Sequence, residues 1–303
     1  MDDQILYRLN IIISYHHSFF TKGVIIMSVP NTTTRRNVIK AGLASFTSAV
    51  AATPLSYAAM PNEIKPKTSG ETRVIFLGGD YLHNFAAQEP VLRRICEKAG
   101  WTFLAVHDAR FVTPELISDT DLLMIQRWDG AVPGWVPGPI YEEAPTDDGY
   151  LSGELEEAII DNVRNRGMGF MCLHCTIAAW GKPRFMELLG VHGIIHGPLQ
   201  PLRVHNFNQN HPITRGMNNF DLALDENFGA ELVNKNALPL YETTGFLDKR
   251  HDIGGWCLEQ GKGRVVGLLA GHTYFAYRDP NYLPLYWRGA HWALKKDIPQ
   301  YKR

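Results

Sequence analysis

Two histidines and two adjacent carboxylates follow short apolar runs in this 303-residue chain, at positions where strands would end. These residues are His174, His272, Asp225 and Glu226. Imidazole and carboxylate side chains are the groups that most often move protons in enzymes. We therefore expect a catalytic site with His174, Glu226 and His272 at its centre and with Asp225 orienting or assisting them. A single histidine is often structural, but two that each end a buried strand favour a shared site.

The same side chains are a common ligand set for a divalent metal. Two imidazoles and a carboxylate suit zinc or a similar ion, with a further position left for water or substrate. We therefore expect His174, Glu226 and His272 to be metal ligands if the fold brings them together. The chain has no local metal motif such as H-E-x-x-H. Metal-free acid and base catalysis by the same groups stays open as the alternative.

Five further side chains are candidates for contacting the substrate: His83, Trp128, Trp180, His196 and Glu231. His83 and Trp128 follow the first and third expected strands, and Trp180 follows the fourth. A tryptophan there can stack on a sugar ring or can simply cover the crevice. His196 precedes a Gly-Pro turn and Glu231 comes five residues after Glu226. We expect these residues to line the substrate side of the site.

Three other kinds of site are disfavoured by the sequence. Residues 78–83 lack the spaced glycines of a dinucleotide fingerprint and the hydroxyl-rich phosphate loop of a flavin protein, so we expect no nucleotide or flavin. The chain has no G-x-S-x-G elbow, which argues against a serine hydrolase of the α/β type. A nucleophilic Cys175 next to His174 remains a weaker alternative.

Strands and helices alternate through the first half of the domain. Apolar runs at 72–79, 102–106, 121–125 and 169–173 indicate buried strands, and periodic apolar residues at 91–99 and 155–163 indicate helices. In such a sheet, ligands bind beyond the carboxyl ends of the strands. We therefore expect an α/β fold with a doubly wound, mostly parallel sheet and the candidate residues at its carboxyl edge.

The second half of the domain is less regular. Strands are expected at 221–224 and 238–243, followed by a hairpin of 255–258 with 264–269 and a final helix around 285–294. Few elements are predicted between residues 190 and 220. We read residues 72–303 as one domain with an elaborated C-terminal half, preceded by a linker at 59–71.

Residues 1–58 read as an N-terminal extension that carries an export signal. Paired Arg35 and Arg36 precede a small apolar run at 41–52, and residues 56–58 offer a small-x-small cleavage site. This pattern resembles a twin-arginine signal, which predicts the export machinery as a partner and a periplasmic or secreted location. The run is too short for a membrane anchor. Met27 is an alternative start to Met1.

The charge balance disfavours some classes of partner, and the cysteine positions disfavour a disulfide framework. The chain has 30 Lys and Arg against 31 Asp and Glu, which gives a net charge of -1 and no basic footprint for nucleic acid or an anionic membrane. Its four cysteines form no disulfide framework by their positions, although a bridge between Cys172 and Cys175 is possible. A small neutral ligand fits this charge balance.

Several ordered motifs resemble those of the ThuA-like, or trehalose-utilisation, family over residues 72–294. They are GMGFMCLH at 167–174, NHPITRG at 210–216, DEN at 225–227, GKGRV at 261–265 and GHT at 271–273, with Asp279-Pro280 and Trp292-Ala293 in agreement. The resemblance implies a flavodoxin-like fold of the class I glutamine amidotransferase type without the catalytic cysteine. It also implies a role in sugar catabolism, on oxidised (keto) disaccharides. The long segment 128–150 and the presence of Cys175 depart from the pattern, so the substrate is not carried over.

Together these observations predict an exported enzyme of carbohydrate catabolism. It would be a hydrolase, lyase or isomerase that acts on a sugar or keto-sugar, assisted by a divalent metal. The alternative from another class is a non-catalytic sugar-binding protein in which the same polar groups hold ligand hydroxyls. The sequence does not predict an oligomeric state.

Overall fold

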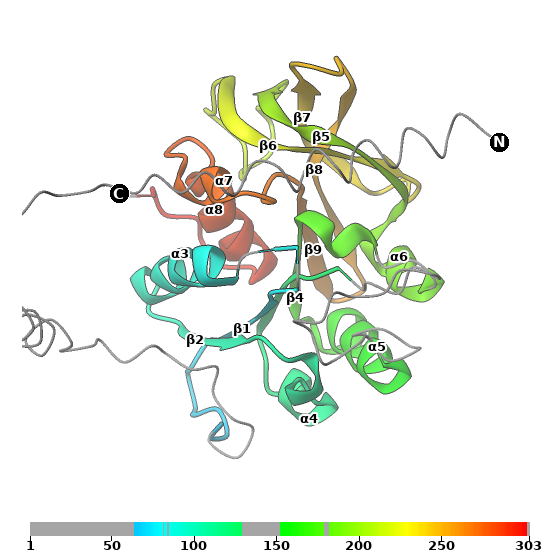
Figure 1. Ribbon diagram of the computed structural model, residues 1–303. Helices are drawn as coiled ribbons and strands as arrows, with labels where there is room; N and C mark the ends of the chain where they lie inside the picture. Colours follow the sequence, from blue (N-terminus) through cyan, green and yellow to red (C-terminus); the bar gives the residue numbers. More distant parts are fainter. Residues whose placement is uncertain (1–63, 81, 84, 129–151, 179–181, 302–303) are drawn as a thin grey trace, which may run out of the picture. The chain divides into compact units, whose positions relative to one another are not determined.

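The computed structural model describes residues 64–80, 82–83, 85–128, 152–178 and 182–301 (Figure 1). The chain divides into two units, Met1–Leu55 and Ser56–Arg303, and the described residues belong to the second. The expected export signal at 1–58, Trp180 and most of the long segment 128–150 lie outside the described residues. Among the residues that are described, no helix has the length and apolar character needed to cross a bilayer.

The centre of the described region is one nine-stranded sheet with the order β2-β1-β3-β4-β9-β8-β7-β5-β6. The strands are β1 (Arg73–Gly78), β2 (Thr102–Val106), β3 (Leu122–Gln126), β4 (Gly169–Leu173), β5 (Val191–His205), β6 (Phe220–Leu232), β7 (Leu238–Gly245), β8 (His251–Gln260) and β9 (Gly263–Leu268). Strands β2, β1, β3, β4 and β9 pair in parallel. Strands β9, β8, β7, β5 and β6 pair antiparallel. The sheet is therefore mixed, with β9 at the junction of its two halves.

The parallel half is buried on both faces, as the continuous apolar runs of its strands require. In β1, Val74 and Phe76 enter one core cluster while Ile75 and Leu77 enter the other. Helices α3 (Phe85–Lys98) and α8 (Leu283–Ala293) pack on the first face, whereas α5 (Gly153–Asp161) and α6 (Pro183–Leu189) pack on the second (Figure 1). This burial holds the carboxyl ends of the parallel strands in fixed positions.

Six α-helices are described, and three of them begin at a residue whose side chain caps the first turn. They are α3 (Phe85–Lys98), α4 (Pro114–Ser118), α5 (Gly153–Asp161), α6 (Pro183–Leu189), α7 (Tyr274–Arg278) and α8 (Leu283–Ala293), with single turns at η2 (Ala109–Phe111), η3 (Asn162–Arg166) and η4 (His174–Ala178). The Thr113 hydroxyl accepts a hydrogen bond from the Leu116 N–H and Pro114 is the first residue of α4, as expected for a helix start. The Thr273 hydroxyl caps α7 in the same way, directly after His272.

The prediction of a doubly wound, mostly parallel, flavodoxin-like or class I glutamine amidotransferase-like sheet is wrong. Only half of the strand pairings are parallel, and the parallel strands have five or six residues each. The antiparallel strands are longer, with 15 residues in β5 and 13 in β6. The physical reason is that the irregular second half forms an extension of the same sheet, with its strands joined to β9 through β8.

Strand β5 is the strand that the sequence did not predict. It contains Gly197, Pro198 and Pro201, which interrupt a strand pattern. The structure accommodates them with register shifts in the pairing of β5 with β6, between His196 and Leu199 and between Gln200 and Leu202. Strand β6 is also longer than expected, so that Asp225 and Glu226 lie within it rather than after its end.

The tight turn between β8 and β9 gives a test of this fold. A Cβ atom at Gly263 would lie 2.6 Å from the Met168 carbonyl oxygen and would also overlap the Val163 carbonyl oxygen. Both are backbone atoms that cannot move alone, so we expect Gly263→Ala to lower the free energy of unfolding by about 1–3 kcal/mol. Urea denaturation followed by circular dichroism measures this change.

Gly153 is the matched control, since a Cβ atom there meets nothing within 4 Å at the start of α5. We expect Gly153→Ala to change stability by less than about 1 kcal/mol, in the stabilising direction. Equal destabilisation by both substitutions would contradict the packing described for this turn.

Candidate functional site

Three imidazole rings meet at the carboxyl edge of the parallel strands. His83, His174 and His272 each offer a ring nitrogen, and these atoms all lie within 4.8 Å of one another. Their ring centres are 5.0 Å apart for His83 with each of the others and 5.4 Å apart for His174 with His272. The rings come from segments that follow β1, β4 and β9, which are separated by about 90 residues or more in the sequence.

His83 is held by the turn that follows β1. The Asp80 carboxylate accepts hydrogen bonds from the backbone N–H groups of Leu82 and His83, and it lies 2.8 Å from His83 Nδ1. The backbone N–H of Trp128 donates to the same carboxylate at 2.7 Å. Although burial opposes it, the contact with His83 lowers the pKa of Asp80 below its ordinary value. With Nδ1 bound to Asp80, the free nitrogen of His83 is Nε2.

His174 is fully buried at the point where β4 ends. Its backbone has φ 45°, a left-handed conformation that residues other than glycine rarely adopt. Its Nδ1 lies 2.7 Å from the Leu269 carbonyl oxygen, so Nδ1 carries the proton and donates it. Its Nε2 is buried with no hydrogen-bond partner among the described residues. Burial lowers the pKa of His174 to about 4, which keeps the ring neutral.

His272 is positioned by a buried carboxylate on a different strand. The Asp225 side chain of β6 is fully buried and accepts hydrogen bonds from the backbone N–H groups of Gly271 at 3.2 Å and His272 at 3.0 Å. On the other side of this turn, the Gln126 amide donates to the Gly271 carbonyl oxygen at 2.6 Å and accepts a hydrogen bond from the Tyr277 hydroxyl. Burial raises the pKa of Asp225 to about 7, against the effect of the N–H groups that it accepts.

Glu226 lies between two of the imidazoles. One of its carboxylate oxygens is 3.1 Å from His272 Nδ1 and 3.6 Å from His174 Nε2. Neither contact is a hydrogen bond, since both nitrogens are without a hydrogen-bond partner and the His174 contact is too long. Burial opposes ionisation, but the two imidazoles hold the pKa of Glu226 well below its usual range. The carboxylate in turn raises the pKa of His272 against the effect of burial.

This arrangement fits a divalent cation. Buried ring nitrogens without partners are costly unless something binds them, and two of them point at one space beside a carboxylate. The Nδ1–H of His83 donates to the Asp80 carboxylate, and the Nδ1–H of His174 donates to the Leu269 carbonyl oxygen. Histidines that bind a metal through one ring nitrogen usually make such a hydrogen bond with the other. Of the three ligands expected from the sequence, His174, Glu226 and His272 are brought together, and the structure adds His83 to them.

The other expected substrate contacts are placed unequally. His196 is exposed and its ring stacks on Phe228 at 5.1 Å, while Phe228 contacts His174 at 4.3 Å, so His196 lies one ring away from the cluster. Trp128 touches the site through its backbone N–H, which binds Asp80. Glu231 is not part of the cluster, since it is exposed on the sheet beside His192 at 3.8 Å.

Cys175 lies within the site but lacks the features of a nucleophile. It is 2% exposed, and burial raises the pKa of its thiol well above the ordinary value. Its Sγ is 3.4 Å from His83 Nδ1, which already binds Asp80 and so cannot serve as a free base. The bridge with Cys172 that the sequence left possible is not formed, since all four cysteines are free and buried.

The residues that sequence reasoning missed are those that hold the histidines. Gln126 and Tyr277 support the Gly271 turn, and nothing in their local sequence indicates this role. Asp80 carried a signal, since a carboxylate three residues before a histidine can bind that ring across a turn. His83 was expected to contact substrate, whereas the structure makes it the third imidazole of the cluster.

Comparison with known proteins identifies relatives of this fold. The sequence profile of the ThuA family, described as trehalose utilisation, matches residues 73–293. A ThuA-like protein from Bacteroides uniformis is 15% identical, with a TM-score of 0.55 over 81% of this chain and 97% of its own. The cytoplasmic protein STM1381 from Salmonella typhimurium is 14% identical, with a TM-score of 0.50 over 73% of this chain and 99% of its own. A search of curated proteins finds no match.

The thiols provide one test of the site. Cys96, Cys172, Cys175 and Cys257 are all buried with raised pKa values, so we expect none to react with Ellman's reagent in the native protein at pH 8. All four should react after denaturation in guanidinium chloride. One thiol that reacts rapidly in the native protein, and that Cys175→Ser removes, would contradict the inert role given to Cys175.

The protonation of His174 provides another test. Its folded pKa of about 4 lies below the ordinary value of 6.5, so protonation is disfavoured in the folded state until the pH approaches 4. In metal-free protein at pH 6 we expect a neutral His174 with its proton on Nδ1, seen by long-range ¹H–¹⁵N NMR. His272 should be protonated in the same sample because its pKa is raised. A charged His174 at pH 6 would overturn this assignment.

Proposed function

The chain belongs to the ThuA, or trehalose utilisation, family, and on that premise we propose that it is an exported enzyme acting on a sugar or a disaccharide-derived keto-sugar. The single observation that carries the proposal of catalysis is the cluster of His83, His174 and His272, with the Glu226 carboxylate beside the last two. A buried set of this kind, with ring nitrogens left unpaired, is costly for folding and suits a reaction centre.

We propose that His83, His174 and His272 hold a divalent cation such as zinc, with Glu226 as a fourth ligand or as its neighbour. Imidazole nitrogens favour ions of the zinc, nickel and cobalt type. When bound, such an ion would polarise a substrate carbonyl or activate a water molecule. Asp80 and the Leu269 carbonyl would fix the ring orientations, because each accepts the Nδ1 proton of one ligand.

Proton movement is assigned to Glu226 and His272. The lowered pKa of Glu226 keeps it ionised near neutral pH, so it can accept a proton from a substrate hydroxyl or from a carbon next to a ketone. In the metal-free alternative His272, whose pKa is raised and which lies 3.1 Å from Glu226, can return a proton to a leaving oxygen. Asp225 acts through the backbone, where it holds Gly271 and His272 against β6.

Substrate recognition is assigned to the rim of this cluster. The exposed ring of His196, stacked on Phe228, offers a face and a nitrogen to a sugar. Trp128 follows β3, and its backbone N–H binds Asp80. Trp180 is proposed as a substrate contact from the sequence alone. The paired arginines Arg35 and Arg36 and the apolar run after them support export to the periplasm by the twin-arginine route.

The test combines metal content with turnover. Protein purified without added metal is analysed by plasma mass spectrometry and assayed on native and 3-keto disaccharides, with and without chelator. We expect about one divalent ion per chain and activity that the chelator removes. His174→Ala and His272→Ala should each weaken metal binding by about tenfold or more and abolish turnover.

His192→Ala is the control, because His192 is exposed at the far end of β5 and pairs with Glu231 outside the cluster. It should keep both metal and activity. Stoichiometric metal in His174→Ala and His272→Ala would show that the ligand assignment is wrong. Protein that binds these sugars but never consumes them would overturn catalysis and support the sugar-binding alternative.

A further inference from the structure

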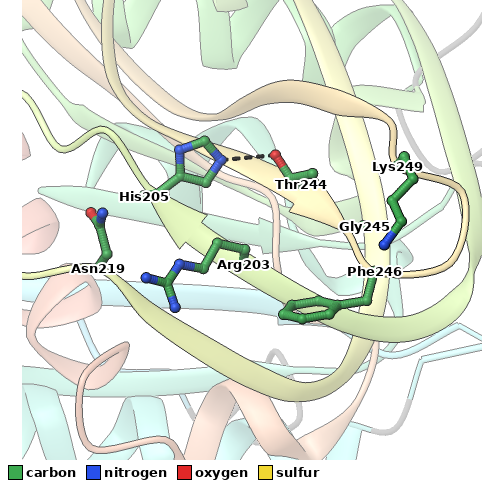
Figure 2. Close-up of a pocket in the computed structure, with 7 residues that line it drawn as sticks. All are labelled: Arg203, His205, Asn219, Thr244, Gly245, Phe246 and Lys249. Carbon is green, nitrogen blue, oxygen red and sulfur yellow. Dashed lines mark hydrogen bonds between the residues drawn. The ribbon is translucent and has the colours of Figure 1, made fainter.

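A separate cavity of about 400 Å³ lies on the antiparallel half of the sheet. Figure 2 shows its lining residues, which are Arg203, His205, Asn219, Thr244, Gly245, Phe246 and Lys249. None of them belongs to the histidine cluster. Arg203 lies four residues along β5 from Leu199, the partner of Glu226, a span of about 13 Å at 3.3 Å per residue.

The cavity lies on the face of β5 that turns away from the main core. Leu202 and Val204 are buried in that core, and because side chains alternate along a strand, Arg203 and His205 point to the opposite face. His205 Nε2 lies 2.8 Å from the Thr244 hydroxyl, which fixes both groups in the cavity (Figure 2).

The turn that carries Phe246 and Lys249 is fixed before any ligand arrives. The fully buried Gln200 accepts hydrogen bonds from the backbone N–H of Leu247 at 2.6 Å and of Asp248 at 3.3 Å. The Phe246 N–H donates to the Pro201 carbonyl oxygen at 3.1 Å. A cavity with a preformed wall binds a ligand with less loss of conformational entropy.

The described lining holds two cations and no carboxylate. Arg203 donates one N–H to Asp221 at 2.9 Å, which leaves other N–H groups of its guanidinium for a ligand. Among the described residues no carboxylate pairs with Lys249, whose Nζ lies 6.0 Å from the centre of the Phe246 ring. The Phe246 ring itself is 42% exposed. The lining thus combines a partly exposed aromatic ring with two cationic side chains. The carboxylates beside it, Asp221 and Glu242, contact Arg203 and the imidazoles of His205 and His251 rather than Lys249.

From this chemistry we infer that the cavity is a second binding site, for a sugar that carries a carboxylate or phosphate group. Arg203 and Lys249 bind the oxyanion, since guanidinium and ammonium groups form charge-assisted hydrogen bonds with it. The apolar face of the sugar ring packs on Phe246. Asn219 and Thr244 offer the mixed donors and acceptors that sugar hydroxyls need. This inference does not depend on the histidine cluster being catalytic.

The test titrates the full chain with glucuronate, glucose 6-phosphate and neutral glucose, followed by calorimetry and NMR shift changes. We expect one or both anionic sugars to bind at least tenfold more tightly than glucose, and the stronger of the two identifies the oxyanion. Lys249→Met and Arg203→Met should each weaken that binding at least tenfold, and Phe246→Ala should weaken it for both anionic sugars.

Lys235→Met is the control, since Lys235 is an exposed lysine on the turn between β6 and β7, outside the cavity. It should bind the anionic sugars as tightly as the parent protein does. His174→Ala should also bind them normally, because His174 lies in the histidine cluster and not in this cavity. Thermal melts establish that each variant is folded. No binding of either anionic sugar at about 10 mM, or binding that Lys249→Met and Arg203→Met leave unchanged, would overturn the inference.

Discussion

The carboxylate of Asp225 is the contact on which the candidate site depends. It lies on β6 at the antiparallel edge of the sheet, yet it accepts the backbone N–H groups of Gly271 and His272, which follow β9 at the junction with the parallel half. Because the carboxylate is fully buried, its loss would leave these N–H groups without partners in a dry environment. One side chain therefore brings Glu226 and His272 to the same place and fastens the two halves of the sheet together there.

Burial of the histidine cluster costs free energy, because it removes ionisable groups from water. Burial lowers the pKa of His174, whereas Glu226 raises that of His272, so neighbouring rings have opposite tendencies to take up a proton. Each is fixed by a hydrogen bond or backbone contact from outside the cluster, through Asp80 and the Leu269 carbonyl oxygen among others. His174 Nε2 and His272 Nδ1 make no hydrogen bond within the described residues and have the Glu226 carboxylate as their polar neighbour, which leaves both nitrogens available to a ligand.

The sequence predicted the parallel strands and the proximity of His174, His272 and Glu226, because the strand ends follow from local patterns. Apolar runs ending at His174 and near His272 gave the carboxyl edge of the sheet, and the family resemblance over residues 72–294 is confirmed by the profile match at 73–293. The mixed character of the sheet was not predicted, because β5 contains prolines and its pairing with β6 is irregular. Gln126 could not be predicted as a support of the Gly271 turn, because 145 residues separate the two and only the folded sheet brings them together.

The left-handed backbone at His174 has an evolutionary consequence. At φ 45°, glycine or asparagine would adopt the same conformation with less strain, and neither would bury an unpaired imidazole nitrogen. Variation that is filtered for folding alone should therefore drift away from histidine at this position. Retention of histidine among relatives would indicate that the cluster is selected for something other than folding, and replacement by a small residue would indicate relatives that keep the fold without the cluster.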